Sequence, residues 1–169
     1  MMNIKTNRLE INRFKENDVR SYSEIMIKPE VTRFLGNGTP WLKEEAEKRA
    51  EQKIKFINEC IKEKGFGVYA VRESSTGQLI GHCGFQKLED GRLEFLYAYD
   101  PSVWGKGYAQ EAGKALLDYA RENFCFPELI GLVYPENEGS INVLKKLGFK
   151  KNREEEFFGK MLNVFLLER

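Results

Sequence analysis

Three strand-like segments follow one another between residues 66 and 100, separated only by brief turns. The segments cover residues 66–72, 78–88 and 92–100, and the turns cover residues 74–77 and 89–91. Turns this short join antiparallel neighbours, because parallel strands need a crossover of about a dozen residues or more. The chain is therefore predicted to place an antiparallel sheet at the centre of its fold.

The region after residue 100 connects its strands through helices instead. Apolar residues at helical spacing predict a helix over 107–124, which leads into a buried strand over 129–133. A helix of this length allows a β-α-β crossover. The other predicted elements are a strand over 8–14, a short helix after Asn17 and Asp18, a helix over 42–63 with Leu42 on its apolar face, a helix over 137–147, and one or two closing strands over 149–167. The predicted fold class is mixed α/β (α+β), in a single domain spanning residues 1–169.

The charge balance and the single histidine exclude several classes of protein. The chain has 169 residues, of which 27 are basic and 26 acidic, for a net charge of +1. A general nucleic-acid or membrane-surface binder usually carries a clear basic excess, so neither partner is expected. One histidine, His82, cannot build a site that needs two imidazoles, and we expect no metal. With no secretory signal and no apolar run of about 18 residues, we expect a cytoplasmic protein.

The cysteines do not form a pattern with evident chemistry. There are three of them and no C-x-x-C pair, so a disulfide framework is not expected. Cys83 and Cys125 are predicted to be small buried hydrophobic residues. His82 is predicted to lie on a strand surface. Because His82 and Cys83 are adjacent in a strand, they point to opposite faces and cannot form a catalytic dyad.

The strongest local signal is a glycine-rich turn between the strand at 92–100 and the following helix. It reads Trp104-Gly105-Lys106-Gly107-Tyr108-Ala109. A turn of this kind presents free backbone N–H groups at the positive end of a helix, which suits a phosphate, although a plain strand-to-helix turn has the same composition. A Walker A loop is excluded because Lys114 is followed by Ala115, and the dinucleotide pattern fails because Gln110 stands where its third Gly or Ala belongs.

A second signal follows the strand at 129–133. Pro135 breaks that strand, Asn137 can cap the next helix, and Ser140 lies in the first turn of that helix. Both polar side chains are predicted to lie near the end of the strand, close to the glycine-rich turn. Simple capping explains them equally well, and for Asn137 capping is compatible with ligand contact.

These blocks, together with Lys146-Leu147-Gly148-Phe149, resemble the GNAT superfamily of N-acetyltransferases. The resemblance runs from about residue 4 to the C-terminus. Further residues resemble the branch typified by ribosomal-protein N-terminal acetyltransferases (RimJ/RimL type), namely Thr6-Asn7-Arg8-Leu9, Asp18, Pro29-Glu30-Val31 and Ile80-Gly81-x-x-Gly84-Phe85.

The resemblance implies a central, mostly antiparallel sheet splayed into a V and flanked by helices, with acetyl-CoA as co-substrate in the cleft. It implies that the pantetheine pairs with the strand near Leu96, Tyr97 and Ala98, and that Asn137 contacts the pantetheine arm while Ser140 lies near the thioester. Lys146 is a candidate partner for the CoA phosphates. The pyrophosphate would lie against the turn and the helix start, at Trp104, Gly105, Lys106, Gly107, Tyr108, Ala109 and Gln110.

Acetylation of a primary amine by direct attack on a thioester requires a neutral amine and a stabilised carbonyl oxygen, and no enzyme nucleophile. Glu94 is the candidate base. A backbone N–H near Leu96 or Tyr97 is the candidate oxyanion donor, and Ser140 or Tyr134 is the candidate acid for the departing thiolate.

The acceptor would be a protein N-terminus or a small amine, bound by residues drawn from 28–65. A non-catalytic acyl-CoA-binding or sensing module is the alternative, and monomer and homodimer both stay open.

Overall fold

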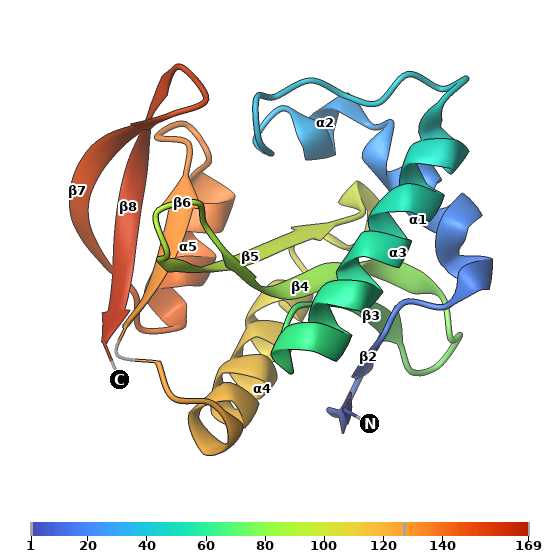
Figure 1. Cartoon of the computed structure of the whole chain (residues 1–169), viewed down its shortest axis with the longest axis horizontal. Helices are drawn as coiled ribbons and strands as arrows, with labels where there is room; N and C mark the ends of the chain where they lie inside the picture. The colour runs from blue at the N-terminus through green and yellow to red at the C-terminus, as the bar shows by residue number, and fades with distance from the viewer. Residues whose placement is uncertain (1, 127, 169) are drawn as a thin grey trace.

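Eight strands form one continuous sheet that organises the chain (Figure 1). The computed structural model describes residues 2–126 and 128–168. The strands are β1 (Asn3–Lys5), β2 (Leu9–Asn12), β3 (Val68–Glu73), β4 (Leu79–Lys87), β5 (Leu93–Tyr99), β6 (Glu128–Val133), β7 (Lys150–Phe157) and β8 (Lys160–Glu168). The helices are α1 (Val19–Met26), α2 (Pro29–Thr32), α3 (Ala46–Lys64), α4 (Tyr108–Asn123) and α5 (Glu138–Lys146), and single 3-10 turns cover Glu16–Asp18 and Pro101–Val103.

The sheet is antiparallel except at one junction in its middle. Its strand order is β1-β2-β3-β4-β5-β6-β8-β7, and β5 and β6 are the parallel pair. These two strands share one register pair, Glu94 with Ile130, whereas β5 is aligned with β4 along its whole length. Beyond Glu94 the two strands separate. The mostly antiparallel, splayed sheet expected from the sequence is therefore confirmed.

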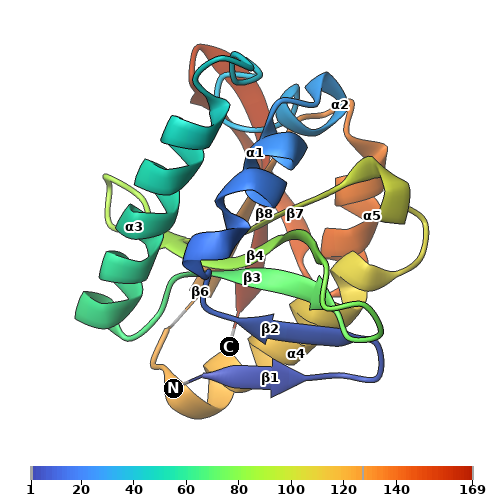
Figure 2. The same cartoon turned by 90° about the vertical axis from the view of Figure 1, so that its right-hand side faces the viewer.

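Helices cover both faces of the sheet (Figure 2). On one face, the Tyr22 ring of α1 lies 5.7 Å from the His82 ring of β4, and α3 packs beside α1. On the other face, a side chain at Gly113 of α4 would meet Phe95 of β5 and Leu147 at the end of α5. Side chains of β5 alternate between these two faces. Glu94, Leu96 and Ala98 consequently face α1 and α3, while Tyr97 faces α4 and α5.

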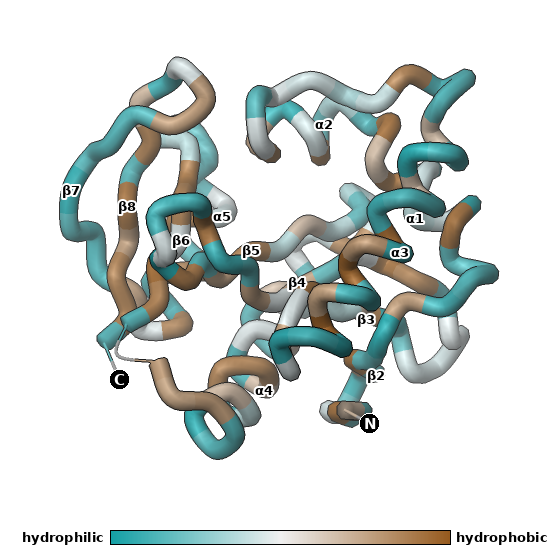
Figure 3. Tube along the Cα trace, in the orientation of Figure 1, coloured by the Kyte–Doolittle hydropathy of each residue, from teal (hydrophilic) through white to brown (hydrophobic). Residues whose placement is uncertain are grey.

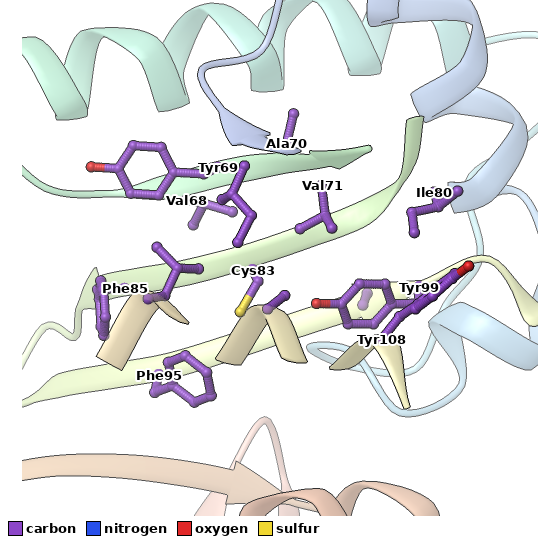
Figure 4. Packing of buried hydrophobic residues seen from close by; sticks show 14 of the residues in the cluster. Val68, Tyr69, Ala70, Val71, Ile80, Cys83, Phe85, Phe95, Tyr99 and Tyr108 are labelled. Carbon is purple, nitrogen blue, oxygen red and sulfur yellow. The ribbon is translucent and has the colours of Figure 1, made fainter. Parts of the chain in front are cut away.

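The core forms where apolar positions of the helices meet the central strands. In α3 the buried side chains recur three or four residues apart, at Ile54, Ile57 and Ile61, which is the spacing that gives a helix one apolar face. Cys83, Phe85 and Phe95 point to the α4 side of β4 and β5 (Figure 4). The central strands are hydrophobic on both faces because helices cover both.

The C-terminal hairpin shows how position in the sheet determines composition. β8 lies between β6 and β7 and is mostly buried, while β7 is the edge strand and is mostly exposed. The hydropathy of the two strands differs accordingly, with β7 hydrophilic and β8 hydrophobic (Figure 3). A charged edge strand discourages pairing with another chain.

Several details differ from the sequence-based expectations. The strand predicted over 8–14 is shorter, and the short β1 that pairs with it was not predicted. Leu42 precedes α3 and is 62% exposed, because the chain does not enter the helix until Ala46. His82 is buried rather than on a surface, because α1 covers it. Cys83 is buried as expected, but Cys125 lies exposed just after α4.

Candidate active site

The gap between β5 and β6 leaves a backbone edge of β5 without a neighbouring strand. The Asp100 N–H donates to the Ile80 carbonyl at 2.8 Å, so this residue faces β4. Alternate residues of a strand direct their N–H groups to opposite edges, and the register with β4 is continuous through Leu96. The N–H groups of Leu96 and Ala98 therefore face β4, and that of Tyr97 faces the open edge. Of the three residues predicted to pair with pantetheine, Tyr97 is the one whose backbone is available.

A set of unsatisfied backbone donors lies at the start of α4. Gly105 and Gly107 have φ of +75° and +79°, a conformation that glycine adopts without strain. Gly107 is the N-cap residue and contributes no side-chain cap, so the first N–H groups of α4 lack intrahelical partners. A Cβ at Gly105 would meet nothing within 4 Å. The first N–H groups of α4 therefore lie at an open turn, which is a geometry that suits an anion.

Arg8 connects this turn to the N-terminal strands. Its Nη1 donates to the Lys106 carbonyl at 2.9 Å, and its guanidinium lies 4.5 Å from the centre of the Tyr108 ring. The same guanidinium pairs with Glu111, at 2.7 Å from Nε and 2.6 Å from Nη2. Burial raises the pKa of Glu111, but hydrogen bonds from Thr6 and Arg8 outweigh it and leave this pKa lowered. The network fixes the turn from outside the site.

The start of α5 faces the same gap. Asn137 caps this helix by accepting a 3.2 Å hydrogen bond from the Ser140 N–H at its Oδ1. The Ser140 hydroxyl lies 2.8 Å from the Tyr97 hydroxyl, and the Tyr97 hydroxyl also lies 3.1 Å from the Ser140 carbonyl. When Tyr97 donates to that carbonyl, Ser140 donates to Tyr97. When Tyr97 donates to the Ser140 hydroxyl instead, the Ser140 proton is free for another acceptor. Burial raises the pKa of Tyr97, so this hydroxyl stays protonated.

Tyr134 follows β6 but its hydroxyl is directed elsewhere. The hydroxyl donates to the Gly36 carbonyl at 2.7 Å, and the ring lies 5.7 Å from the Phe34 ring. The ammonium group of Lys160, the first residue of β8, lies 5.3 Å from the Tyr134 ring centre. The contact joins the segment after α2 to the end of β6, across the mouth of the gap. Because its proton is engaged at Gly36, Tyr134 is less suited than Ser140 to act as the acid.

Glu94 lies at the last point where β5 and β6 are paired. Its side chain is 8% exposed, and Gln86 Nε2 donates to its Oε2 at 2.6 Å. Burial raises the pKa of Glu94 to about 7, although the Gln86 hydrogen bond lowers it in part. A carboxyl group with this pKa can exchange a proton near neutral pH. This is the property that a general base requires.

A small basic groove lies between α4 and α5. Its volume is about 170 Å³. It brings Gln110 and Lys146, both predicted cofactor contacts, together with Lys114 and Arg121. Arg121 lies in the last turn of α4 and pairs with Asp118 of the same lining at 3.2 Å, so Lys114 and Lys146 are the positive side chains that this groove offers to an anion.

The structure thus gathers most of the predicted residues around one gap. Trp104 is 49% exposed and donates its Nε1–H to the Tyr99 carbonyl at 2.8 Å, and Lys106 is exposed at the turn. Sequence reasoning missed the side chains of Gln86, Tyr97 and Arg8. Gln86 was recoverable, because a hairpin that turns at residues 89–91 places it opposite Glu94. The other two depend on contacts 43 and 98 residues apart, which no local pattern reveals.

Residues 2–126 and 128–168 contain no group of three His, Cys, Asp or Glu side chains positioned to hold a metal ion. No helix in these ranges has the length and apolar character to cross a membrane.

A family model described as an acetyltransferase (GNAT) domain matches residues 8–150. The chain therefore belongs to the GNAT acetyltransferase family and is an acyltransferase of the N-acetyltransferase class, which confirms the resemblance seen in the sequence.

Individual relatives agree with this assignment. The chain is 30% identical to the uncharacterized N-acetyltransferase p20 of Bacillus licheniformis, over 98% of this chain and 94% of that protein. The crystal structure of an acetyltransferase from Agrobacterium tumefaciens has a TM-score of 0.84 at 23% identity and covers 100% of this chain and 95% of its own. A RimL ribosomal L7/L12 acetyltransferase in complex with coenzyme A has a TM-score of 0.81 at 16% identity, covering 99% and 98%. These two structures show the shared fold.

Proposed function

We propose that this protein transfers an acetyl group from acetyl-CoA to a primary amine by direct attack of the amine on the thioester. The observation that carries this proposal is the coincidence of three features at the β5–β6 split. They are the open Tyr97 N–H, the uncapped start of α4, and the buried Glu94 carboxyl.

The residues around the split fit acetyl-CoA by their donor chemistry. The first N–H groups of α4 suit a pyrophosphate, and no side chain lies where a Cβ at Gly105 would be. Lys106 at the turn and Lys146 in the groove supply positive charge for phosphates. The open edge of β5 suits an extended chain with amide groups, such as pantetheine. A RimL protein that shares the fold was solved in complex with coenzyme A, which supports this assignment.

The chain's own groups would then divide the chemistry among them. Bound acetyl-CoA supplies the thioester carbonyl that the amine attacks. Glu94 accepts the proton of the amine, directly or through a water molecule, since its pKa is near 7. The Tyr97 N–H is the oxyanion donor that we favour, because the N–H of Leu96 faces β4. Ser140, in contact with Tyr97, donates the proton that the departing thiolate needs.

A non-catalytic acyl-CoA-binding module would keep the anion turn and the open edge but would have no use for a base. The buried Glu94 argues against this alternative, because burial of an unneeded carboxyl is unfavourable. The relatives named as N-acetyltransferases offer the alternative no support.

The first experiment is thermal unfolding with acetyl-CoA, with ATP and NAD as controls. At about 100 times the dissociation constant, a ligand adds about 2.7 kcal/mol, which raises the melting temperature by roughly 5–10 °C for a chain of this size. A shift with acetyl-CoA alone supports the site and leads to a panel of amines with thiol release as the readout. No shift at millimolar acetyl-CoA would contradict the proposal.

A further inference from the structure

A second cavity, of about 470 Å³, lies between α3 and the segment that joins α2 to α3. This segment crosses above the sheet in Figure 1. The walls of the cavity combine aromatic rings with positive charge, and no acidic residue contributes to them within the described part of the chain. Its lining includes Trp41, Phe56, Arg49, Lys53 and Asn37.

The two positive side chains of this pocket have aromatic partners and no carboxylate partner among the described residues. Arg49 lies over the Trp41 ring at 5.0 Å, and Lys53 lies over the Phe56 ring at 5.9 Å. They are four residues apart on α3, so they project from the same face of the helix. Phe56 is 58% exposed, which leaves its ring available to a ligand.

The pocket is connected by packed rings to the strand that carries the candidate base. The Tyr22 ring lies 5.8 Å from the Trp41 ring and 5.7 Å from the His82 ring. His82 is aligned with Ala98 of β5, and Glu94 lies on the same face of that strand. Burial, with a smaller contribution from the charge of Lys53, lowers the pKa of His82 to about 3, so this ring is neutral near neutral pH.

We propose that this pocket binds the carboxylate end of the acceptor, so that the substrate is a primary amine that carries a carboxylate and an apolar or aromatic body. Arg49 and Lys53 supply donors for the carboxylate, and Trp41 and Phe56 contact the apolar body. A polycationic amine is disfavoured because two positive charges face it. The identification of the ligand as the acetyl acceptor rests on the proposed function. The existence of a carboxylate-binding pocket does not depend on it.

Gly36 lines this pocket and accepts the hydrogen bond of the Tyr134 hydroxyl just after β6, so the pocket lies beside the end of that strand. The kinetic test uses a short peptide, Ala-Ala-Phe, with a free carboxylate, the same peptide with a C-terminal amide, and spermidine. In the wild-type protein, the acid is expected to have a KM about 10-fold lower than the amide, with similar kcat, and spermidine a higher KM than either.

Matched double variants on α3 distinguish direct contact with the carboxylate from a general effect of positive charge on this helix. The double variant Arg49→Gln with Lys53→Gln is expected to bring the ratio of the two KM values close to 1. Lys48→Gln with Lys55→Gln removes the same charge from exposed α3 positions that do not line the pocket, and is expected to keep the ratio. Equal KM values for acid and amide in the wild type, or the same ratio in both double variants, would overturn the proposal.

A binding measurement makes the outcome independent of turnover. Trp41 and Trp104 are the two tryptophans, so Trp104→Phe leaves Trp41 as the one fluorophore of this type. Titration with N-acetyl-Ala-Ala-Phe is expected to change the Trp41 emission, with a dissociation constant several-fold lower than for its amide. Absence of that preference contradicts the pocket assignment even when amines are acetylated. A preference for the acid without acetylation of any amine contradicts the proposed function and leaves the pocket intact.

Discussion

The Gln86 side chain donates a 2.6 Å hydrogen bond from Nε2 to Oε2 of Glu94, directly across the β4–β5 ladder. The two residues are opposite one another, so the contact is fixed by the register of the hairpin. Glu94 is almost fully buried, and among the described residues Gln86 is the one side chain that hydrogen-bonds to its carboxyl group. Gln86 therefore both orients the carboxyl group and stabilises its ionised form.

Replacing the carboxyl group by an amide tests the role of Glu94. Glu94→Gln keeps the shape and the contact with Gln86 but cannot accept a proton. We expect kcat to fall by about 10²–10⁴-fold, the usual contribution of a general base, with the acetyl-CoA dissociation constant nearly unchanged. Initial rates of thiol release and a binding titration measure the two quantities. A variant with wild-type kcat would exclude Glu94 as the base.

Removing the hydrogen bond instead tests the positioning role of Gln86. The rate is expected to rise with pH through the ionisation of Glu94, near pH 7. Because the Gln86 hydrogen bond lowers the pKa of Glu94, Gln86→Ala is expected to move this midpoint to higher pH. A pH profile of kcat at saturating amine measures this midpoint. Loss of rate with an unmoved midpoint would indicate general damage to the site.

The hydroxyl pair of Tyr97 and Ser140 is expected to act as one unit. Tyr97→Phe and Ser140→Ala should each lower kcat by about 10-fold, because each removes one group of the proton path. The double variant should lose little more than either single variant, since coupled residues are not additive. Tyr119→Phe removes a hydroxyl from α4 away from the split and serves as control. Additive losses would contradict a shared role.

Arg8 is expected to affect cofactor binding without touching the cofactor's reacting atoms. Arg8→Gln removes the hydrogen bond to the Lys106 carbonyl and the stacking on the Tyr108 ring. The glycine-rich turn is then less ordered in the free protein, and ordering it costs part of the binding free energy of the ligand. We expect the acetyl-CoA dissociation constant to rise about 3–10-fold, with kcat at saturation preserved. Arg20→Gln, which removes a solvent-exposed ion pair with Glu24, is the control. Equal behaviour of the two variants would show that Arg8 has no such role.

The sequence was sufficient to predict features that depend on local pattern. The antiparallel segments, the crossover helix, the glycine-rich turn before α4 and the Asn137 cap all follow from turn length, periodicity and capping chemistry. Glu94 was selected as the candidate base from its place in the strand over 92–100, and its catalytic role stays a prediction.

The features that the sequence did not reveal depend on which surfaces meet. His82 was expected on a surface because a strand pattern cannot show that α1 will cover that face. The choice of Tyr97 over Leu96 as the open backbone donor needed the register with β4. The direction of the Tyr134 hydroxyl depends on Gly36, which is 98 residues away. Such contacts are long-range, so periodicity and spacing carry no information about them.

The raised pKa of Glu94 also predicts a dependence of stability on pH. In the folded protein this pKa is about 7, against an ordinary value of 4.5, so folding disfavours the ionised form. The free energy of unfolding is therefore unaffected by this group below about pH 4.5 and decreases as pH rises to 7, by a total of about 3 kcal/mol. Glu94→Gln lacks this penalty, so its advantage over the wild type should be largest above pH 7 and small near pH 4.5. Denaturant unfolding of both proteins at several pH values measures the difference, with the exposed Glu122→Gln as control. A constant difference across this pH range would contradict the raised pKa and, with it, the suitability of Glu94 as a base near neutral pH.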